Sequence, residues 1–324
     1  MAKNQLSLSL LTLYADLVQQ VETAPIAGTV YQRERHGITY HYAKVPVGSD
    51  RIDTFVGRMG DPVADAQAQL LTRGMTLAKD RRQNVSILKS AGLAGPDRML
   101  GAALDAIAHA GLFRDGAVLV GTSAYMLSEP FVGCRLPAPL LMTGDLDLAT
   151  ANIALTADPP EPMEAILRRA DPTFEAVMQL DPRQPAARFR NARGYLIDLL
   201  APTRRRGERP VPLKHLNAGA EPLQHLRWLI DQSVSAVALW RAGVAVKIPQ
   251  PARFAVHKLI VAQRRGPTDR IKRQKDLAQA EAMISSLHSN DHFALEDAME
   301  DARGQGRSWA NAIDRSLAEI DGRA

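Results

Sequence analysis

Cysteine is nearly absent from this sequence, in which Cys134 is the only one among 324 residues. A single cysteine cannot form a disulfide within the chain, and it excludes a cysteine-rich zinc site. This usage is typical of proteins from a reducing compartment, and we predict a cytoplasmic location. Aromatic residues are also scarce, at 5% of the chain, which argues against a protein built mainly on aromatic platforms that stack on nucleic-acid bases.

Long apolar runs are missing too. No segment reaches the roughly 18–20 apolar residues that a membrane-spanning helix needs, so we expect no membrane partner. Residues 6–14 are apolar, as in a signal peptide, but Asp16 follows them and apolar residues continue at helical spacing as far as Val21. We therefore predict that residues 5–23 form an amphipathic helix that packs on the rest of the protein.

The composition that remains is that of an ordinary globular protein, with 46% hydrophobic and 23% charged residues. A chain of 324 residues is long enough for two domains, or for one domain with large additions. Changes in the predicted secondary structure along the chain indicate an N-terminal region at 1–95, a central core at 96–215 and a C-terminal region at 216–324. The formal net charge of +5 permits an anionic partner such as RNA without requiring one.

The N-terminal region has the pattern of a β-hairpin followed by a long helix. β-Favouring residues on both sides of His36-Gly37 predict the hairpin, and a third short strand is expected at 52–56. Tyr40 and Tyr42 alternate, so one face of their strand is aromatic and either belongs to the core or stacks on bases. Apolar residues at helical spacing predict a helix over 63–93.

The rest of the chain mixes strands and helices before it becomes helical. We expect strands at 117–120, 140–149 and within 188–200, and helices at 99–110, 122–127 and 163–178. Beyond residue 220 the pattern favours helices, at 225–240, 251–264, 268–286 and twice more near the end. The predicted fold class is α/β (α+β), with a mixed-sheet core between an N-terminal hairpin and helical region and a C-terminal helical region.

The segment Asp145-Leu146-Asp147 carries the strongest chemical signal in the chain. Residues i and i+2 of a strand point to the same side, about 6.5–7 Å apart, so two carboxylates placed this way can converge on one cation. Hard cations such as Mg²⁺ take oxygen ligands, usually one or two carboxylates together with substrate phosphates. A bare Asp-x-Asp pair is nevertheless common, and a solvated strand end is the alternative.

Two further segments point the same way. In Val120-Gly121-Thr122-Ser123 a strand runs into a glycine, two hydroxyl residues and a helix. A glycine lets the backbone approach a phosphate, and the first turn of a helix offers free N–H groups, although simple helix capping explains the same residues. Asp198 lies inside an apolar strand, where a carboxylate needs a cation or a basic partner such as Arg190 or Arg193.

Together these segments resemble the nucleotidyltransferase fold of the DNA polymerase β type. In that superfamily an apolar strand runs into Gly-Gly or Gly-Ser, Asp-apolar-Asp follows on the next strand, and a third acid lies on a later strand. More narrowly, the chain is similar to a bacterial family of nucleotidyltransferase-like proteins over residues 121–125, 133–137, 142–149, 251–259 and 275–277. Two departures are Thr-Ser after Gly121 and a long gap before Asp145, which predicts that residues 128–139 loop out.

The resemblance implies a two-metal nucleotidyl transfer. Asp145 and Asp147 would hold a Mg²⁺ or Mn²⁺ ion that binds the triphosphate of an NTP substrate. With Asp198 they would hold a second ion that activates the acceptor hydroxyl, and Asp198 could also take the acceptor proton. The NTP phosphates would lie against Gly121, Thr122, Ser123 and Lys258, the last of which is otherwise a surface lysine.

The acceptor is left open by the sequence. Basic runs at 204–209 and 264–275 would steer an RNA such as tRNA if both border the cleft, and are otherwise solvated surfaces. A protein side chain or a small molecule would serve as well, and a toxin-like role is compatible with the resemblance. The alternatives are a non-catalytic nucleic-acid-binding or interaction protein that retains the fold, and a phosphohydrolase that uses the same acids.

Overall fold

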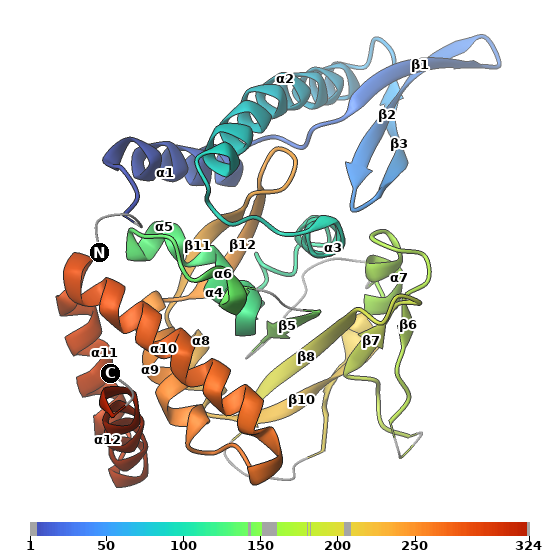
Figure 1. The fold of residues 1–324 in the computed structure, drawn as a ribbon. Helices are drawn as coiled ribbons and strands as arrows, with labels where there is room; N and C mark the ends of the chain where they lie inside the picture. The colour runs from blue at the N-terminus through green and yellow to red at the C-terminus, as the bar shows by residue number, and fades with distance from the viewer. Residues whose placement is uncertain are drawn as a thin grey trace.

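A computed structural model describes residues 5–141, 144–150, 161–179, 181, 183–203 and 209–322. Within these residues, helices surround a mixed sheet, and a smaller sheet formed by residues 29–58 projects from the body (Figure 1). The predicted α/β (α+β) class is confirmed. None of the helices in this part of the chain is long and apolar enough to cross a membrane.

The central sheet is built around β8 (Leu196–Thr203). Along one edge β8 pairs in parallel with β5 (Asp145–Ala149), and β5 pairs antiparallel with β4 (Val118–Val120). Along the other edge β8 pairs first with β7 (Arg188–Arg190) and then with β10 (Ala218–Gln224). Two short outer strands complete the sheet: β6 (Glu175–Ala176) and β9 (Val211–Leu213).

The two faces of this sheet differ because side chains alternate along each strand. Leu146 and Leu148 of β5, with Ile197 and Leu199 of β8, are at most 1% exposed and belong to the main hydrophobic core. The aspartates that alternate with these residues therefore lie on the opposite face. Burial of the apolar face fixes the register, since a shift by one residue would place the carboxylates in the core.

The N-terminal region forms an arm, defined as β1 (Thr29–Arg35), β2 (Ile38–Val47), β3 (Asp50–Arg58) and the start of α2 (Pro62–Ser90). The three strands form an antiparallel sheet, and its β1–β2 turn points away from the body (Figure 1). Both turn residues, His36 and Gly37, have positive φ, as a two-residue type I′ hairpin requires. The predicted hairpin, third strand and long helix are confirmed, as is the first helix, α1 (Leu8–Thr23).

Further predicted helices are confirmed with small changes at their ends. In the core region these are α3 (Arg98–His109) and α4 (Gly121–Leu127). In the C-terminal region they are α9 (Pro251–Ala262), α10 (Arg270–Asn290), α11 (His292–Gly304) and α12 (Arg307–Asp321).

The expectation of a helix over 225–240 was wrong. Only α8 (Leu226–Ile230) is helical there, and it is followed by β11 (Ser233–Ala238), which pairs with β12 (Val244–Pro249). Polar and apolar residues alternate with the period of a strand over residues 233–236, and the buried Ala-Val-Ala that follows is short enough for a core strand.

Three further expectations were also wrong. The helix over 163–178 stops as α7 (Met163–Arg168), because Pro172 disfavours helical geometry at the residue before it. Residues 128–139 do not loop out as expected: Glu129, in α5 (Glu129–Val132), is 2% exposed and accepts hydrogen bonds from the backbone N–H groups of Ala94 and Leu136. The strand expected from residue 140 begins only at Asp145, after the short α6 (Ala138–Leu141).

Candidate active site

Strand pairing brings the predicted acids to one place. Asp147 of β5 and Asp198 of β8 are register partners in parallel strands, so their side chains leave the same face of the sheet next to each other. Asp145 precedes Asp147 by two residues in β5 and lies on that face as well. Acids that are far apart in the chain thus become neighbours.

The turn at Gly121 lies next to Asp147 on the side of β5 opposite β8. Val120, the last residue of β4, is the register partner of Asp147, and Gly121 begins α4 directly after it. Gly121 has a φ of +65°, and a Cβ atom there would lie 2.3 Å from Oδ2 of Asp147. Only glycine therefore allows both the turn and the approach of the backbone to the carboxylate.

The carboxyl group of Asp147 has a raised pKa. Burial raises the pKa of its carboxyl to about 6, and the negative charges of Asp145 and Asp198 act in the same direction. The positive charges of Lys258 and Arg188 oppose this shift in part. Crowded carboxylates with incomplete compensation are a common sign of a functional site, because a pocket built only for stability avoids them.

Asp198 is held by an arginine. Its side chain is 17% exposed, and both carboxylate oxygens accept hydrogen bonds from Arg188 at 2.6 and 2.7 Å. Arg188 lies on β7 as the register partner of Asp198, whereas the partners considered from the sequence were Arg190 and Arg193. The charge of Asp198 is therefore already compensated by a bidentate ion pair.

This pairing affects the metal prediction. Within the described part of the chain, no three His, Cys, Asp or Glu side chains come close enough to one another to form a metal-binding group. The structure thus brings Asp145, Asp147 and Asp198 into electrostatic contact, but it does not arrange them as a three-acid cage. Carboxylate oxygens remain the donor type that Mg²⁺ and Mn²⁺ prefer.

The two hydroxyl residues after Gly121 differ in exposure. Ser123 is 1% exposed, and its Oγ has no hydrogen-bond partner among the described residues. Thr122 is half-buried and lies nearer the surface. Of the two positions weighed from the sequence, Thr122 is thus the one whose hydroxyl a bound phosphate can reach.

Lys258 lies near the acids but is bonded to Asp276, which is not among the predicted site residues. Its Nζ donates to Oδ1 of Asp276 at 2.7 Å, across the contact between α9 and α10. Arg265 Nε donates to the other oxygen of Asp276 at 2.9 Å. Burial alone would raise the pKa of the Asp276 carboxyl. The charges and hydrogen bonds of Lys258 and Arg265 have a larger, opposite effect, so the pKa lies below its usual value.

Lys275 is a further cation beside this network. Burial lowers its pKa, and Lys258 adds to that effect, while Asp145 and Asp276 oppose it. Lys275 therefore lies within the electrostatic reach of Asp145 as well as of Lys258. A sequence signal existed for this group, since Lys275-Asp276 belongs to a segment that resembles the family, but the pairing itself depends on helix packing.

The basic runs are only partly available to a ligand. Residues 204–206 lie outside the described residues. In the second run, Arg265 is bonded to Asp276, Arg273 to Glu319 and Arg264 to Ser308. These contacts favour the interpretation of this run as a charged helix surface stabilised by pairs within the C-terminal region.

Comparison with protein families decides the classification. The sequence model of a family described as nucleotidyltransferase matches residues 98–304, close to two thirds of the chain. The chain belongs to this nucleotidyltransferase family. The match begins with α3 and ends with α11, so it includes the acids, the glycine turn and the Lys258–Asp276 pair, whereas the arm precedes it.

The nucleotidyltransferase has no match among curated proteins and none among solved structures. The family assignment thus supports nucleotidyl transfer in general.

Proposed function

We propose that this nucleotidyltransferase transfers a nucleotide from an NTP to a hydroxyl acceptor, with release of pyrophosphate and with the help of Mg²⁺ or Mn²⁺. The observation that carries the proposal is the position of Asp147. Its carboxylate lies between the Gly121 turn on one strand and Asp198 on the other, with Asp145 beside it. An anion-binding turn next to crowded carboxylates suits a site that binds a metal–triphosphate complex.

The residues present fit a divalent cation. Asp145 and Asp147 would hold it, since both offer carboxylate oxygens on one sheet face and the charge of Asp147 is incompletely compensated. Two carboxylates are enough, because Mg²⁺ usually completes its ligand set with waters and substrate phosphates. A bound ion would supply Lewis-acid stabilisation of the phosphate oxygens.

The remaining residues have roles that follow from their positions. The backbone at Gly121 and the hydroxyl of Thr122 would contact the phosphates, and Lys258, fixed by Asp276, would face them as a cation. Asp198 keeps lone pairs that are not used by Arg188 and can accept the proton of the acceptor hydroxyl. Arg188 would act as a positioning residue that holds the Asp198 carboxylate in place.

The formal net charge of +5 favours an anionic acceptor. An RNA such as tRNA is our preferred acceptor, and a cytoplasmic location remains our expectation from the single cysteine. A toxin-like role would follow if the acceptor were a tRNA that loses function on modification.

Isothermal titration of each NTP, with and without Mg²⁺, tests the site. We expect metal-dependent NTP binding in the wild type and its loss in Asp145→Asn and Asp147→Asn. Asp16→Asn is the matched control, because Asp16 is an exposed acid on α1. Binding that is unchanged in both active-site variants would refute the site.

The pair between Arg188 and Asp198 favours one alternative, a chain that retains the fold and binds nucleic acid without catalysis. In that case Asp198 would serve only as a partner for Arg188. The titration separates the two functions, since a non-catalytic chain would bind NTP weakly and with no dependence on Mg²⁺.

A further inference from the structure

The face of the arm that points away from α2 carries a group of aromatic residues and a group of basic residues. Strand register places Tyr31 opposite Tyr42, and Tyr42 opposite Phe55. Tyr40, two residues from Tyr42, lies on the same face and pairs with Arg33 of β1. We call this surface the outer face of the arm; the register places on it Thr29, Tyr31, Arg33, Arg35, Ile38, Tyr40, Tyr42, Lys44, Pro46, Arg51, Asp53, Phe55 and Arg58.

The aromatic rings of the outer face form a continuous row. Tyr31 and Tyr42 are stacked with 5.7 Å between ring centroids, and Tyr42 lies edge-on to Phe55 at 5.4 Å. Phe55 in turn lies 5.7 Å from Tyr40. Phe55 is 58% exposed and the three tyrosines are half-buried, so the row is open to solvent rather than part of the core. Three of the six tyrosines of the chain are gathered in this row.

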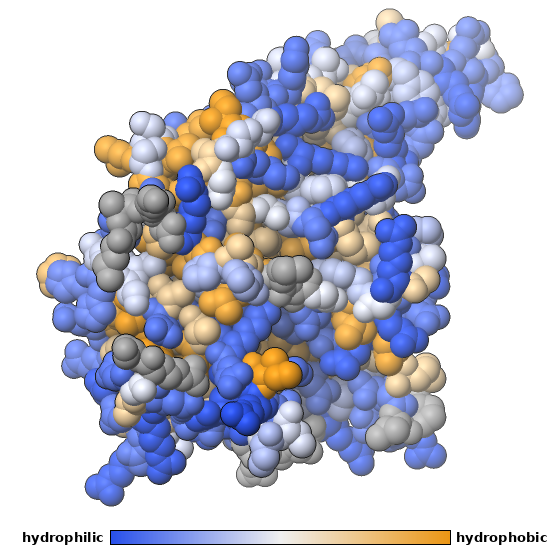
Figure 2. Space-filling model, viewed as in Figure 1, coloured by the Kyte–Doolittle hydropathy of each residue, from blue (hydrophilic) through white to orange (hydrophobic). Residues whose placement is uncertain are grey.

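Positive charge surrounds this row. All five lysine and arginine residues of the three strands lie on the outer face, together with one acid, Asp53. The guanidinium groups of Arg33 and Arg35 lie 5.9 and 5.8 Å from the ring centroid of Tyr42, and Nζ of Lys44 lies 5.6 Å from that of Tyr31. In Figure 2 the visible side of the arm is largely hydrophilic. An aromatic row bordered by cations suits a ligand that has both flat rings and negative charges.

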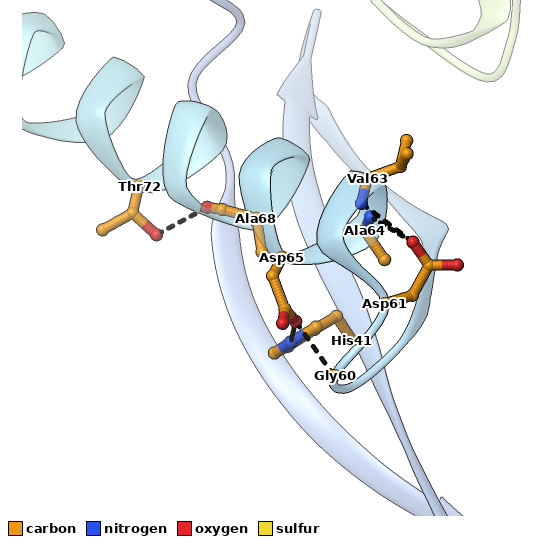
Figure 3. A network of polar contacts seen from close by, with 8 residues as sticks. All are labelled: His41, Gly60, Asp61, Val63, Ala64, Asp65, Ala68 and Thr72. Atoms are coloured by element: carbon orange, nitrogen blue, oxygen red, sulfur yellow. Dashed lines mark hydrogen bonds and ion pairs between the residues drawn. The ribbon is translucent and has the colours of Figure 1, made fainter.

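The opposite face anchors the sheet. His41, between the two tyrosines of β2, is 9% exposed, and its Nε2 lies 2.8 Å from Oδ1 of Asp65 on α2 (Figure 3). The same oxygen accepts a hydrogen bond from Gly60 N–H at 3.3 Å, and Asp61 caps α2 through the N–H groups of Val63 and Ala64 (Figure 3). These contacts fix the sheet on α2 with the aromatic row outward.

The base of the arm is joined to the body. Gly48 N–H donates to Oδ2 of Asp105 on α3 at 2.8 Å, and Ser49 N–H donates to the carbonyl oxygen of Arg169 at 2.8 Å. Gly48 has a φ of +60°, and a Cβ atom there would lie 2.6 Å from that carbonyl oxygen. The arm is therefore a fixed extension of the catalytic body, so a ligand on its outer face is held at a defined position.

We propose that the outer face binds single-stranded RNA through base stacking on the aromatic row and through phosphate contacts with the surrounding cations. A single strand is required because paired bases already bury their faces in the helix stack, whereas unpaired bases can stack on exposed rings. The role of this RNA as the acceptor rests on the proposed function, but its binding does not. The low aromatic content of the whole chain does not oppose this, because the row needs only four rings.

Fluorescence anisotropy with a 5′-labelled single-stranded RNA of about 12 nucleotides, without NTP or metal, tests the proposal. Arg33→Gln/Arg35→Gln keeps the aromatic row, and Tyr42→Leu/Phe55→Leu keeps its apolar bulk while removing two rings. We expect each double variant to weaken binding about tenfold or more, since stacking and phosphate contacts both contribute. Tyr42→Phe should keep most of the affinity because the ring remains. Circular dichroism and thermal unfolding verify that the variants are folded.

The matched control is Arg307→Gln/Arg315→Gln, two exposed arginines on α12 at the opposite end of the molecule (Figure 1). It removes the same charge and should leave RNA binding unchanged. In a salt titration, the slope of log K against log salt should decrease in magnitude by about 1.4 for Arg33→Gln/Arg35→Gln, at roughly 0.7 per phosphate contact.

Three results would overturn the proposal: wild-type affinity in folded arm variants, equal loss in the α12 control, or binding of duplex RNA at least as tight as that of single-stranded RNA. Because the assay contains no NTP, these results are independent of whether nucleotidyl transfer occurs.

Discussion

Gly121 and Asp147 are in such close contact that a Cβ atom at position 121 would lie 2.3 Å from Oδ2 of Asp147. The two residues come from adjacent strands, and the contact exists because β4 and β5 pair with Val120 opposite Asp147. A conformation that only glycine adopts easily is thus found where the backbone meets the carboxylate that we propose as a metal ligand.

Gly121→Ala should abolish metal-dependent NTP binding. The added methyl group displaces the Asp147 carboxylate, and the left-handed conformation costs about 1–2 kcal/mol in addition. Gly37→Ala is the matched control, because Gly37 also has a positive φ, +76°, but no atom lies within 4 Å of its Cβ position. Both variants should lose stability in thermal unfolding, while only Gly121→Ala should lose NTP binding in titration. Equal NTP binding in the two variants would contradict the contact.

Asp147→Asn should stabilise the protein at neutral and alkaline pH when no divalent cation is present. The pKa of about 6 lies above the usual 3.8, so the native state binds more protons than the unfolded state between these values. Stability therefore falls as pH rises through this window. At about pH 8 we expect the free energy of unfolding of the variant to exceed that of the wild type by about 1–3 kcal/mol, with no difference near pH 4.

Urea unfolding at both pH values, in a chelating buffer, measures this difference. The Asp16→Asn control should match the wild type at each pH. A variant that is less stable than the wild type at pH 8 would show that ionised Asp147 stabilises the fold, which is the opposite of what its burial among other acids predicts.

Arg188→Lys should lower the rate of nucleotide transfer about 10–100-fold, the usual effect of changing a group that positions a functional residue. Lysine cannot reproduce the two parallel hydrogen bonds to Asp198. The control is Arg190→Lys on the same strand, whose contact with Glu175 is 3.8 Å long and exposed. The transfer rate should fall in Arg188→Lys and stay at the wild-type value in Arg190→Lys, and the NTP affinity should be nearly unchanged in both variants. Equal rates would remove Arg188 from the mechanism.

Asp276→Asn should cost about 3–5 kcal/mol of stability, because it leaves the largely buried Lys258 without its ionic partner. The additional change Lys258→Met removes the unpaired charge, so the double variant should be more stable than Asp276→Asn alone. The pKa of Asp276 is lowered overall, so its contribution is present at neutral pH and is lost as pH falls below about 4. Urea unfolding of the wild type, the two single variants Asp276→Asn and Lys258→Met, and the double variant gives the coupling energy between the two residues. If the effects of the two single changes simply add in the double variant, the pair is not coupled.

The sequence predicted correctly those elements whose pattern lies within one short segment of the chain. The hairpin at His36-Gly37, the long helix after it and the acids of β5 all follow from residues that are close in the chain. The predicted helix over 225–240 is replaced beyond Ile230 by the strand Ser233–Ala238, where polar and apolar residues alternate over only the first four positions. So short an alternation does not separate a strand from a helix, and the pairing of this segment with Val244–Pro249 decides the outcome.

Pairing between distant segments could not be predicted in the same way. The partner of Asp198 is Arg188 rather than Arg190 or Arg193, because the register of β7 against β8 decides which arginine lies opposite. The Lys258–Asp276 bond likewise depends on how α9 packs against α10. The burial of Ser123 reflects the packing of α4, so the choice between Thr122 and Ser123 needed the structure.

The most direct test of nucleotidyl transfer follows the two ends of the triphosphate separately. The protein is incubated with Mg²⁺, total RNA and protein extract, and each NTP labelled at either the α- or the γ-phosphate. We expect label from the α-phosphate on a defined acceptor, no label from the γ-phosphate, and no transfer by Asp147→Asn. Release of γ-labelled phosphate with no labelled acceptor, or equal transfer by wild type and Asp147→Asn, would rule out nucleotidyl transfer at this site.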